Sequence, residues 1–228
     1  MNFTKKMTAF ACAIACLAWL TPAQAAYTVY TNQATFLTAT GATSATGALP
    51  AVGTVASPRT VGSISFAAMP GSSLNFGTSF DTWSTLIPGI DLAINAVENL
   101  DMISGSTVFA MGFQAHEPGA GGSTVDTCRV VTCTDTTFQI TIKNGATTIG
   151  TESINFPDNT LTFFGIFSDQ AFDRFEVRDI SNTIDDEYFG QVFTGNTAPI
   201  PEPETYAMLL AGLGLLGFAA RRRKQKAA

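Results

Sequence analysis

Four acidic residues gather in one short stretch late in the chain: Asp179, Asp185, Asp186 and Glu187. Hard cations such as calcium bind six to eight oxygen ligands, and loops with several carboxylates supply them. Paired carboxylates here, or with Asp169 and Asp173 just before, would also suit a polysaccharide hydrolase. Because acidic loops of an acidic protein are usually solvated, surface charge is our first interpretation, calcium the second and catalysis the third.

His116 is the one histidine of the chain and precedes a Gly-rich stretch at 119–122. A histidine beside Glu117 or Asp126 would suit a general base. The sequence has no Gly-x-Ser-x-Gly motif and no His-Glu-x-x-His motif to accompany it. We therefore interpret His116 as a solvated loop residue, and we expect neither an enzyme nor a required cofactor.

The charges of the chain are unevenly distributed. The 228 residues carry 12 basic and 18 acidic side chains, but residues 26–200 hold five basic against sixteen acidic ones, a net charge of −11. Phosphate binding requires a basic surface, so nucleic acid is not an expected partner. The remaining basic residues flank apolar segments at the two ends, a pattern typical of membrane handling.

Residues 1–25 have the three parts of a secretory signal peptide. Lys5 and Lys6 form the positive start, an apolar run follows at 7–20, and Ala23 and Ala25 supply the small-x-small cleavage pattern. The run is short for a membrane span and is broken by Pro22. We expect export through the Sec machinery and cleavage by signal peptidase after Ala25.

Cys128 and Cys133 are the cysteines that remain after this cleavage. In an exported protein, a Cys-x4-Cys spacing indicates a disulfide that closes a local turn. A zinc site would need a second pair of cysteines or histidines, which the sequence lacks.

The C-terminal end combines three ordered features. Pro201, Glu202 and Pro203 form an extended segment, an apolar stretch covers 206–220, and a basic cluster begins with Arg221, Arg222 and Arg223. A helix over 206–220 would be about 22 Å long, which is short against a hydrocarbon core of about 30 Å. The basic cluster should remain cytoplasmic, which leaves the acidic region outside.

This end, over residues 199–224, resembles the PEP-CTERM protein-sorting signal, a tail also catalogued as an ice-binding protein C-terminal domain. The resemblance implies a Gram-negative bacterium whose exosortase recognises and cleaves near Pro201, Glu202 and Pro203. Arg221, Arg222 and Arg223 would then stop the tail in the inner membrane. The resemblance also implies a link to exopolysaccharide and biofilm production.

Residues 26–198 read as one exported β-domain. Alternating or continuous apolar runs predict strands at 107–114, 137–142, 147–154, 161–167, 173–178 and 188–193. Asn144-Gly145 between two of these runs predicts a tight hairpin. Helical spacing is weak, near 31–40 and 92–100. These features predict an all-β fold, an antiparallel β-sandwich or jelly roll, between a signal peptide and a C-terminal transmembrane helix.

The sequence therefore predicts a sorted cell-surface or extracellular-matrix protein without catalysis of its own, with exopolysaccharide as a candidate ligand. The alternative is a secreted, carboxylate-dependent polysaccharide hydrolase. Aromatic side chains exposed on a sandwich would stack on sugars, although each is more often a core residue. The candidates are Trp83, Tyr27, Tyr30 and Tyr188.

Overall fold

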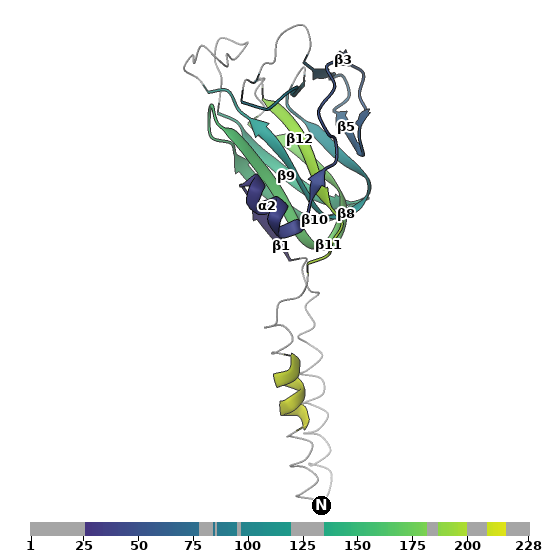
Figure 1. Cartoon of the computed structure of the whole chain (residues 1–228), viewed down its shortest axis with the longest axis vertical. Helices are drawn as coiled ribbons and strands as arrows, with labels where there is room; N and C mark the ends of the chain where they lie inside the picture. Colours follow the sequence, from purple (N-terminus) through teal and green to yellow (C-terminus); the bar gives the residue numbers. More distant parts are fainter. Residues whose placement is uncertain are drawn as a thin grey trace, which may run out of the picture.

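The computed structural model consists mainly of β-strands, with a short helix against one face (Figure 1). It describes residues 26–77, 84, 86–94, 97–119, 135–181, 187–199 and 209–217. Every strand pair is antiparallel. The predicted all-β, antiparallel class is confirmed.

The strands differ greatly in length, from two residues to nineteen. They are β1 (Tyr27–Tyr30), β2 (Thr43–Ser44), β3 (Gly53–Val55), β4 (Arg59–Val61), β5 (Ile64–Ala68), β6 (Leu74–Phe76), β7 (Leu92–Ile94), β8 (Leu100–His116), β9 (Thr137–Asn144), β10 (Thr147–Asn155), β11 (Leu161–Asp179) and β12 (Tyr188–Gly195). Helix α2 covers Gln33–Thr40.

The two longest strands, β8 and β11, belong to two layers at once. Near one end they pair with each other and lie between β1 and β12; near the other end they pair again and lie between β9 and β5. The register shifts between Phe167 and Phe172, and again before Arg174. Bulges of this kind let a strand bend out of one sheet and into another.

The side chains between the two layers form one apolar core. Phe113 of β8 lies with its ring centroid 6.2 Å from Phe175 and 6.0 Å from Phe189, so it contacts side chains of both layers. Phe138 and Phe189 also meet across the layers, at 6.2 Å. Alternation along each strand points these rings inward. The layers therefore pack face to face, as in a β-sandwich.

Helix α2 covers the outer face of one layer. Asn32 caps its start by accepting a hydrogen bond from the Thr35 N–H, and Gly41 ends it in the left-handed conformation. Phe36 of the helix packs on Phe163, with ring centroids 5.1 Å apart. A Cβ at Gly165 would lie 2.8 Å from the Phe36 ring, so this close approach requires glycine.

Several local predictions are confirmed and two are wrong. The hairpin at Asn144-Gly145 joins β9 to β10, and a helix begins near the predicted 31–40. The segments 161–167 and 173–178, predicted as two strands with a turn between them, are one strand, because the bulged ladder carries pairing across the junction. The weak helical spacing near 92–100 is replaced by β7 and the start of β8, because Leu92 and Leu100 are buried between strands.

The C-terminal tail is helical at 209–217, and the rest of the predicted 206–220 helix lies outside the described residues. Within the described part of the chain, no helix has the length and apolar character needed to span a membrane.

Candidate functional site

Three carboxylates from two connections meet at one end of the sandwich. Glu117 directly follows β8, Asp135 precedes β9, and Asp158 lies in the connection between β10 and β11. One oxygen from each lies within 4.8 Å of the others. The acidic cluster Glu117–Asp135–Asp158 is the first candidate site.

The strand pairing explains why these connections meet. His116, the last residue of β8, pairs with Leu161, the first residue of β11, and with Tyr188 of β12. Thr137, the first residue of β9, pairs with Asn155, the last of β10. In an antiparallel sheet the end of one strand lies beside the start of its neighbour. The connections next to these residues therefore share one end of the molecule.

Hydrogen bonds hold two of the three carboxylates of the acidic cluster, those of Glu117 and Asp135. The Thr136 N–H donates to Glu117 Oε1 at 2.6 Å, and the Asn159 N–H donates to the Glu117 carbonyl at 2.8 Å. Asn155 Nδ2 donates to Asp135 Oδ1 at 2.8 Å. The cluster is thus built on backbone contacts between distant segments, with little freedom for Glu117 to turn away.

Glycine at 119 allows two of these segments to approach closely. A Cβ at Gly119 would lie 2.7 Å from Asp158 Oδ2 and 2.5 Å from Asn159 Nδ2. The Gly119 N–H donates to Asn159 Oδ1 at 3.2 Å. A larger residue here would push the Asp158 connection away from the cluster.

Glu117 has an unusual electrostatic environment. The residue is 1% exposed, and burial raises the pKa of its carboxyl to about 8, with added repulsion from Glu187, Asp135 and Asp158. The hydrogen bond from Thr136 acts in the opposite direction. Its second oxygen, Oε2, is buried and has no hydrogen-bond partner among the described residues. Glu117 is therefore a buried carboxyl whose charge is poorly compensated.

The four residues predicted to bind calcium do not lie together at one site among the described residues. Glu187 is buried and close enough to raise the pKa of Glu117, whereas Asp179 lies outside the acidic cluster and accepts a hydrogen bond from the Ser181 N–H at 2.7 Å. Asp185 and Asp186 lie outside the described residues. Sequence reasoning does not find the acidic cluster, although each of its members lies within three residues of a predicted strand.

His116 is not a solvated loop residue, as the sequence had suggested. It ends β8, is fully buried, and stacks on Tyr188 with ring centroids 5.9 Å apart. Strand β8 continues past the predicted end at residue 114, and its pairing places His116 opposite Leu161 and Tyr188.

The two carboxylates that come before the predicted calcium residues bind the backbone. Asp169 Oδ1 accepts from the Ala26 N–H at 3.0 Å, and Asp173 accepts from the Gly145 N–H at 3.1 Å. Both hydrogen bonds hold neighbouring segments together. This gives Asp169 and Asp173 structural roles.

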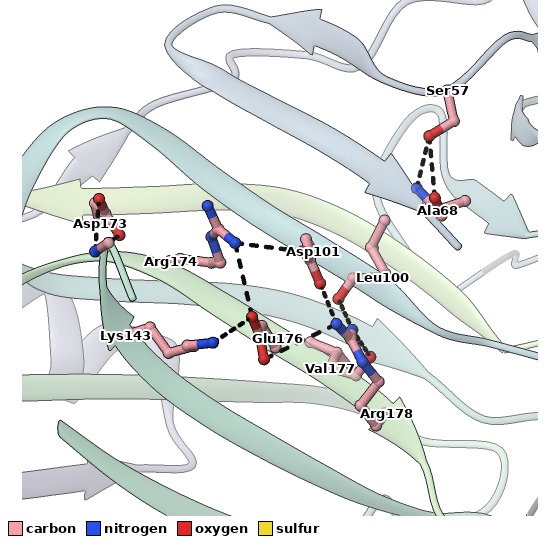
Figure 2. A network of polar contacts seen from close by, with 11 residues as sticks. Ser57, Ala68, Leu100, Asp101, Lys143, Asp173, Arg174, Glu176, Val177 and Arg178 are labelled. Atoms are coloured by element: carbon pink, nitrogen blue, oxygen red, sulfur yellow. Dashed lines mark hydrogen bonds and ion pairs between the residues drawn. The ribbon is translucent and has the colours of Figure 1, made fainter. Parts of the chain in front are cut away.

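A second polar region lies on one sheet surface and is shown in Figure 2. It consists of Lys143 on β9, Asp101 on β8, and Arg174, Glu176 and Arg178 on β11. We call it the charged face.

Ion pairs link all five side chains of the charged face. Lys143 Nζ lies 2.9 Å from Glu176 Oε1, and Arg174 Nη1 lies 3.8 Å from Asp101 Oδ2 and 3.7 Å from Glu176 Oε1. Arg178 contacts both acids. The side chains are 18–29% exposed, and pairs at such positions contribute at most about 1 kcal/mol each. The charged face therefore contributes little to stability and presents donors and acceptors to solvent.

No described tyrosine forms an exposed aromatic platform. Tyr188 is buried, while Tyr27 and Tyr30 are half-buried, and Tyr27 donates its hydroxyl to Glu152 Oε1 at 2.7 Å. Trp83 lies outside the described residues.

The remaining predicted sites lie outside the described residues. They are the signal cleavage residues Ala23 and Ala25, the predicted disulfide Cys128–Cys133, the sorting residues Pro201, Glu202 and Pro203, and the membrane stop Arg221, Arg222 and Arg223.

Comparison with known proteins gave matches among solved structures and none among curated proteins. A carbohydrate binding module of family 29 is 15% identical, with a TM-score of 0.31, covering 76% of this chain and 91% of that one. A mutant of a family 29 module complexed with mannohexaose is 15% identical, with a TM-score of 0.30 and coverage of 76% and 94%. Another family 29 mutant is 14% identical, with a TM-score of 0.32 and coverage of 78% and 100%.

The C-terminal residues match a family model described as the PEP-CTERM protein-sorting motif, over residues 199–224. The match has the boundaries expected from the Pro-Glu-Pro segment, the apolar stretch and the basic cluster. It supports export with sorting by exosortase. The chain carries a PEP-CTERM protein-sorting motif at residues 199–224.

Proposed function

We propose that this chain is an exported, non-catalytic β-sandwich that exosortase delivers to the cell surface or extracellular matrix of a Gram-negative bacterium, where it binds exopolysaccharide. The observation that carries the proposal is the sorting motif at residues 199–224. It follows directly on a folded domain that ends with β12. The folded domain is thus the part that is exported, and the C-terminal tail is the signal that directs its sorting.

The order of processing follows from the two ends. Signal peptidase removes residues 1–25 after the Sec machinery has moved the chain outward. The stretch 206–220 then holds the protein in the inner membrane, with Arg221, Arg222 and Arg223 on the cytoplasmic side. Exosortase cleaves near Pro201, Glu202 and Pro203 and releases the domain for its role in biofilm.

Cleavage at the sorting motif is tested by replacing Pro201, Glu202 and Pro203 with alanine. We expect the variant to remain in the membrane fraction with an uncleaved tail, measured by intact mass. A matched control replaces Asn196 and Thr197 with alanine just before the motif. The same mature mass in wild type and variant would contradict the proposal.

The charged face supports polysaccharide as the ligand. Three of the five basic residues between 26 and 200 lie on it, beside two carboxylates on adjacent strands. Such a surface offers a dense set of charged donors and acceptors, and hydrogen bonds to charged groups are stronger than neutral ones. We therefore assign sugar binding to the charged face.

Sugar binding is tested by co-sedimentation of the exported protein with the exopolysaccharide of the producing cell. We expect Lys143→Gln with Arg174→Gln to lower the bound fraction, while Arg59→Gln, which removes a positive charge outside the charged face, leaves it unchanged. Equal binding by all three proteins would refute the assignment. Release of new sugar reducing ends by the wild type would favour the hydrolase.

A further inference from the structure

The acidic cluster Glu117–Asp135–Asp158 has no role in the proposed sorting or sugar binding. Glu117 and Asp135 lie at the two ends of the β8–β9 connection and Asp158 lies in the β10–β11 connection, yet one oxygen of each lies within 4.8 Å of the others. Like charges at this separation repel each other, more strongly next to a buried group than in water. A compensating positive charge would relieve this repulsion.

A second observation concerns the buried oxygen of Glu117. Oε1 accepts the Thr136 N–H, but Oε2 is buried and has no hydrogen-bond partner among the described residues. Buried polar atoms in proteins are nearly always bonded, and an exception calls for a cause such as an ion. This oxygen belongs to a residue that is 1% exposed and that already lies in the cluster.

Contacts from neighbouring segments hold the backbone around the cluster in place. The Asn159 N–H holds the Glu117 backbone, Asn155 holds Asp135, and Gly119 lets the Asp158 connection come close. These contacts hold Glu117 and Asp135 in place before any ligand arrives and keep the Asp158 connection beside them. Preorganised oxygens at a fixed spacing are what a rigid cation site requires.

We propose that Glu117, Asp135 and Asp158 bind one calcium ion. Calcium–oxygen distances of about 2.3–2.6 Å mean that two ligands of one ion lie at most about 4.6–5.2 Å apart. The three oxygens, all within 4.8 Å of one another, satisfy this limit. The described ligands are all oxygens, the donor type that calcium prefers, with no sulfur or imidazole for zinc. Asp135 and Asp158 are exposed, so water can complete the coordination shell.

This site differs from the calcium site predicted from the sequence. Asp179 is not part of it, and Glu187 lies near it without being one of the three ligands. The residues that build it lie within three residues of the ends of β8, β9 and β11, and the antiparallel register brings these strand ends together.

The test is calcium titration of the exported protein, stripped with a chelator, by calorimetry and by thermal unfolding. We expect one ion per chain, a Kd of about 10⁻⁴–10⁻³ M as in extracellular modules, and a higher Tm with calcium. Glu117→Gln and Asp158→Asn each keep the side-chain shape and should weaken binding at least about tenfold. Asp169→Asn makes the same charge change away from the cluster and should bind as the wild type does.

Two results would overturn the proposal. The first is no heat of binding and no shift in Tm at about 10 mM calcium, above the weak end of the expected range. The second is binding by Asp158→Asn equal to that of wild type. Because Asp158 is exposed, this variant should fold even where a change at buried Glu117 does not. Neither result depends on sorting or sugar binding.

Discussion

Replacing Glu117 with glutamine should change how the stability of the calcium-free protein depends on pH. The pKa of Glu117 rises from 4.5 to about 8 on folding, mainly through burial. Between these values the folded protein holds one proton more than the unfolded chain. The free energy of unfolding therefore falls as pH rises through this window.

The size of the effect follows from the shift. Each pKa unit corresponds to about 1.4 kcal/mol, so the wild type should lose at most about 5 kcal/mol between pH 4.5 and pH 8 from this group. Below pH 4.5 both states are protonated, and above pH 8 both are charged, so the loss is confined to the window. Glutamine cannot ionise, yet it still offers an oxygen to the Thr136 N–H.

The assay is urea unfolding of wild type and Glu117→Gln at pH 5 and pH 9, with a chelator present. Subtracting the two proteins removes the titration of the shared groups that do not interact with Glu117. We expect the variant to gain several kcal/mol relative to wild type between the two pH values. A difference that stays constant across this range would refute the reasoning, since it would mean that Glu117 titrates alike in folded and unfolded protein.

Two further predictions concern the edge of the sandwich and the helix interface. Tyr27→Phe removes the hydrogen bond to Glu152 and should lower the free energy of unfolding by about 1 kcal/mol. Burial, and to a lesser extent the contact with Glu152, raises the pKa of Tyr27 to about 12. Ultraviolet titration should therefore show one tyrosine that ionises late in the wild type and is missing in the variant. If all tyrosines ionise together, this contact is absent in solution. Gly165→Ala places a methyl group against the Phe36 ring and should cost about 1–3 kcal/mol by thermal unfolding, whereas Gly105→Ala, with its nearest neighbour at 3.5 Å, should cost less. Equal effects at both glycines would contradict the packing under helix α2.

The sequence predicts the strands well where alternation is strict. The β9–β10 hairpin is an example, since Asn144-Gly145 fixes both the turn and the register. The sequence predicts two strands where the structure has the single strand β11, because the polar residues at 168–170 resemble a turn. In the structure, pairing of Ser168 with Tyr27 keeps that segment in the sheet. The local pattern of apolar residues indicates which face of a strand is buried, but it does not indicate which distant strand pairs with it.

The same limit explains the candidate site. Glu117, Asp135 and Asp158 each lie within three residues of a strand end, and their spacing in the sequence does not say which strand ends are neighbours. A cluster of Asp185, Asp186 and Glu187 is conspicuous because it is local. The carboxylates that meet in space are joined by the pairing of His116 with Leu161 and of Thr137 with Asn155, which belongs to the tertiary fold.

The place of β12 in the sheet has a mechanical consequence. The sorting tail begins a few residues after this strand, and β12 lies inside the sheet, between β8 on one side and β7 and β2 on the other. A pull on the tail along the strand direction must shear ladder hydrogen bonds on both sides together, because they run across the strands. An edge strand such as β10 would be held by ladder hydrogen bonds on one side alone. The chain thus leaves the domain from a position that resists traction at an anchored surface.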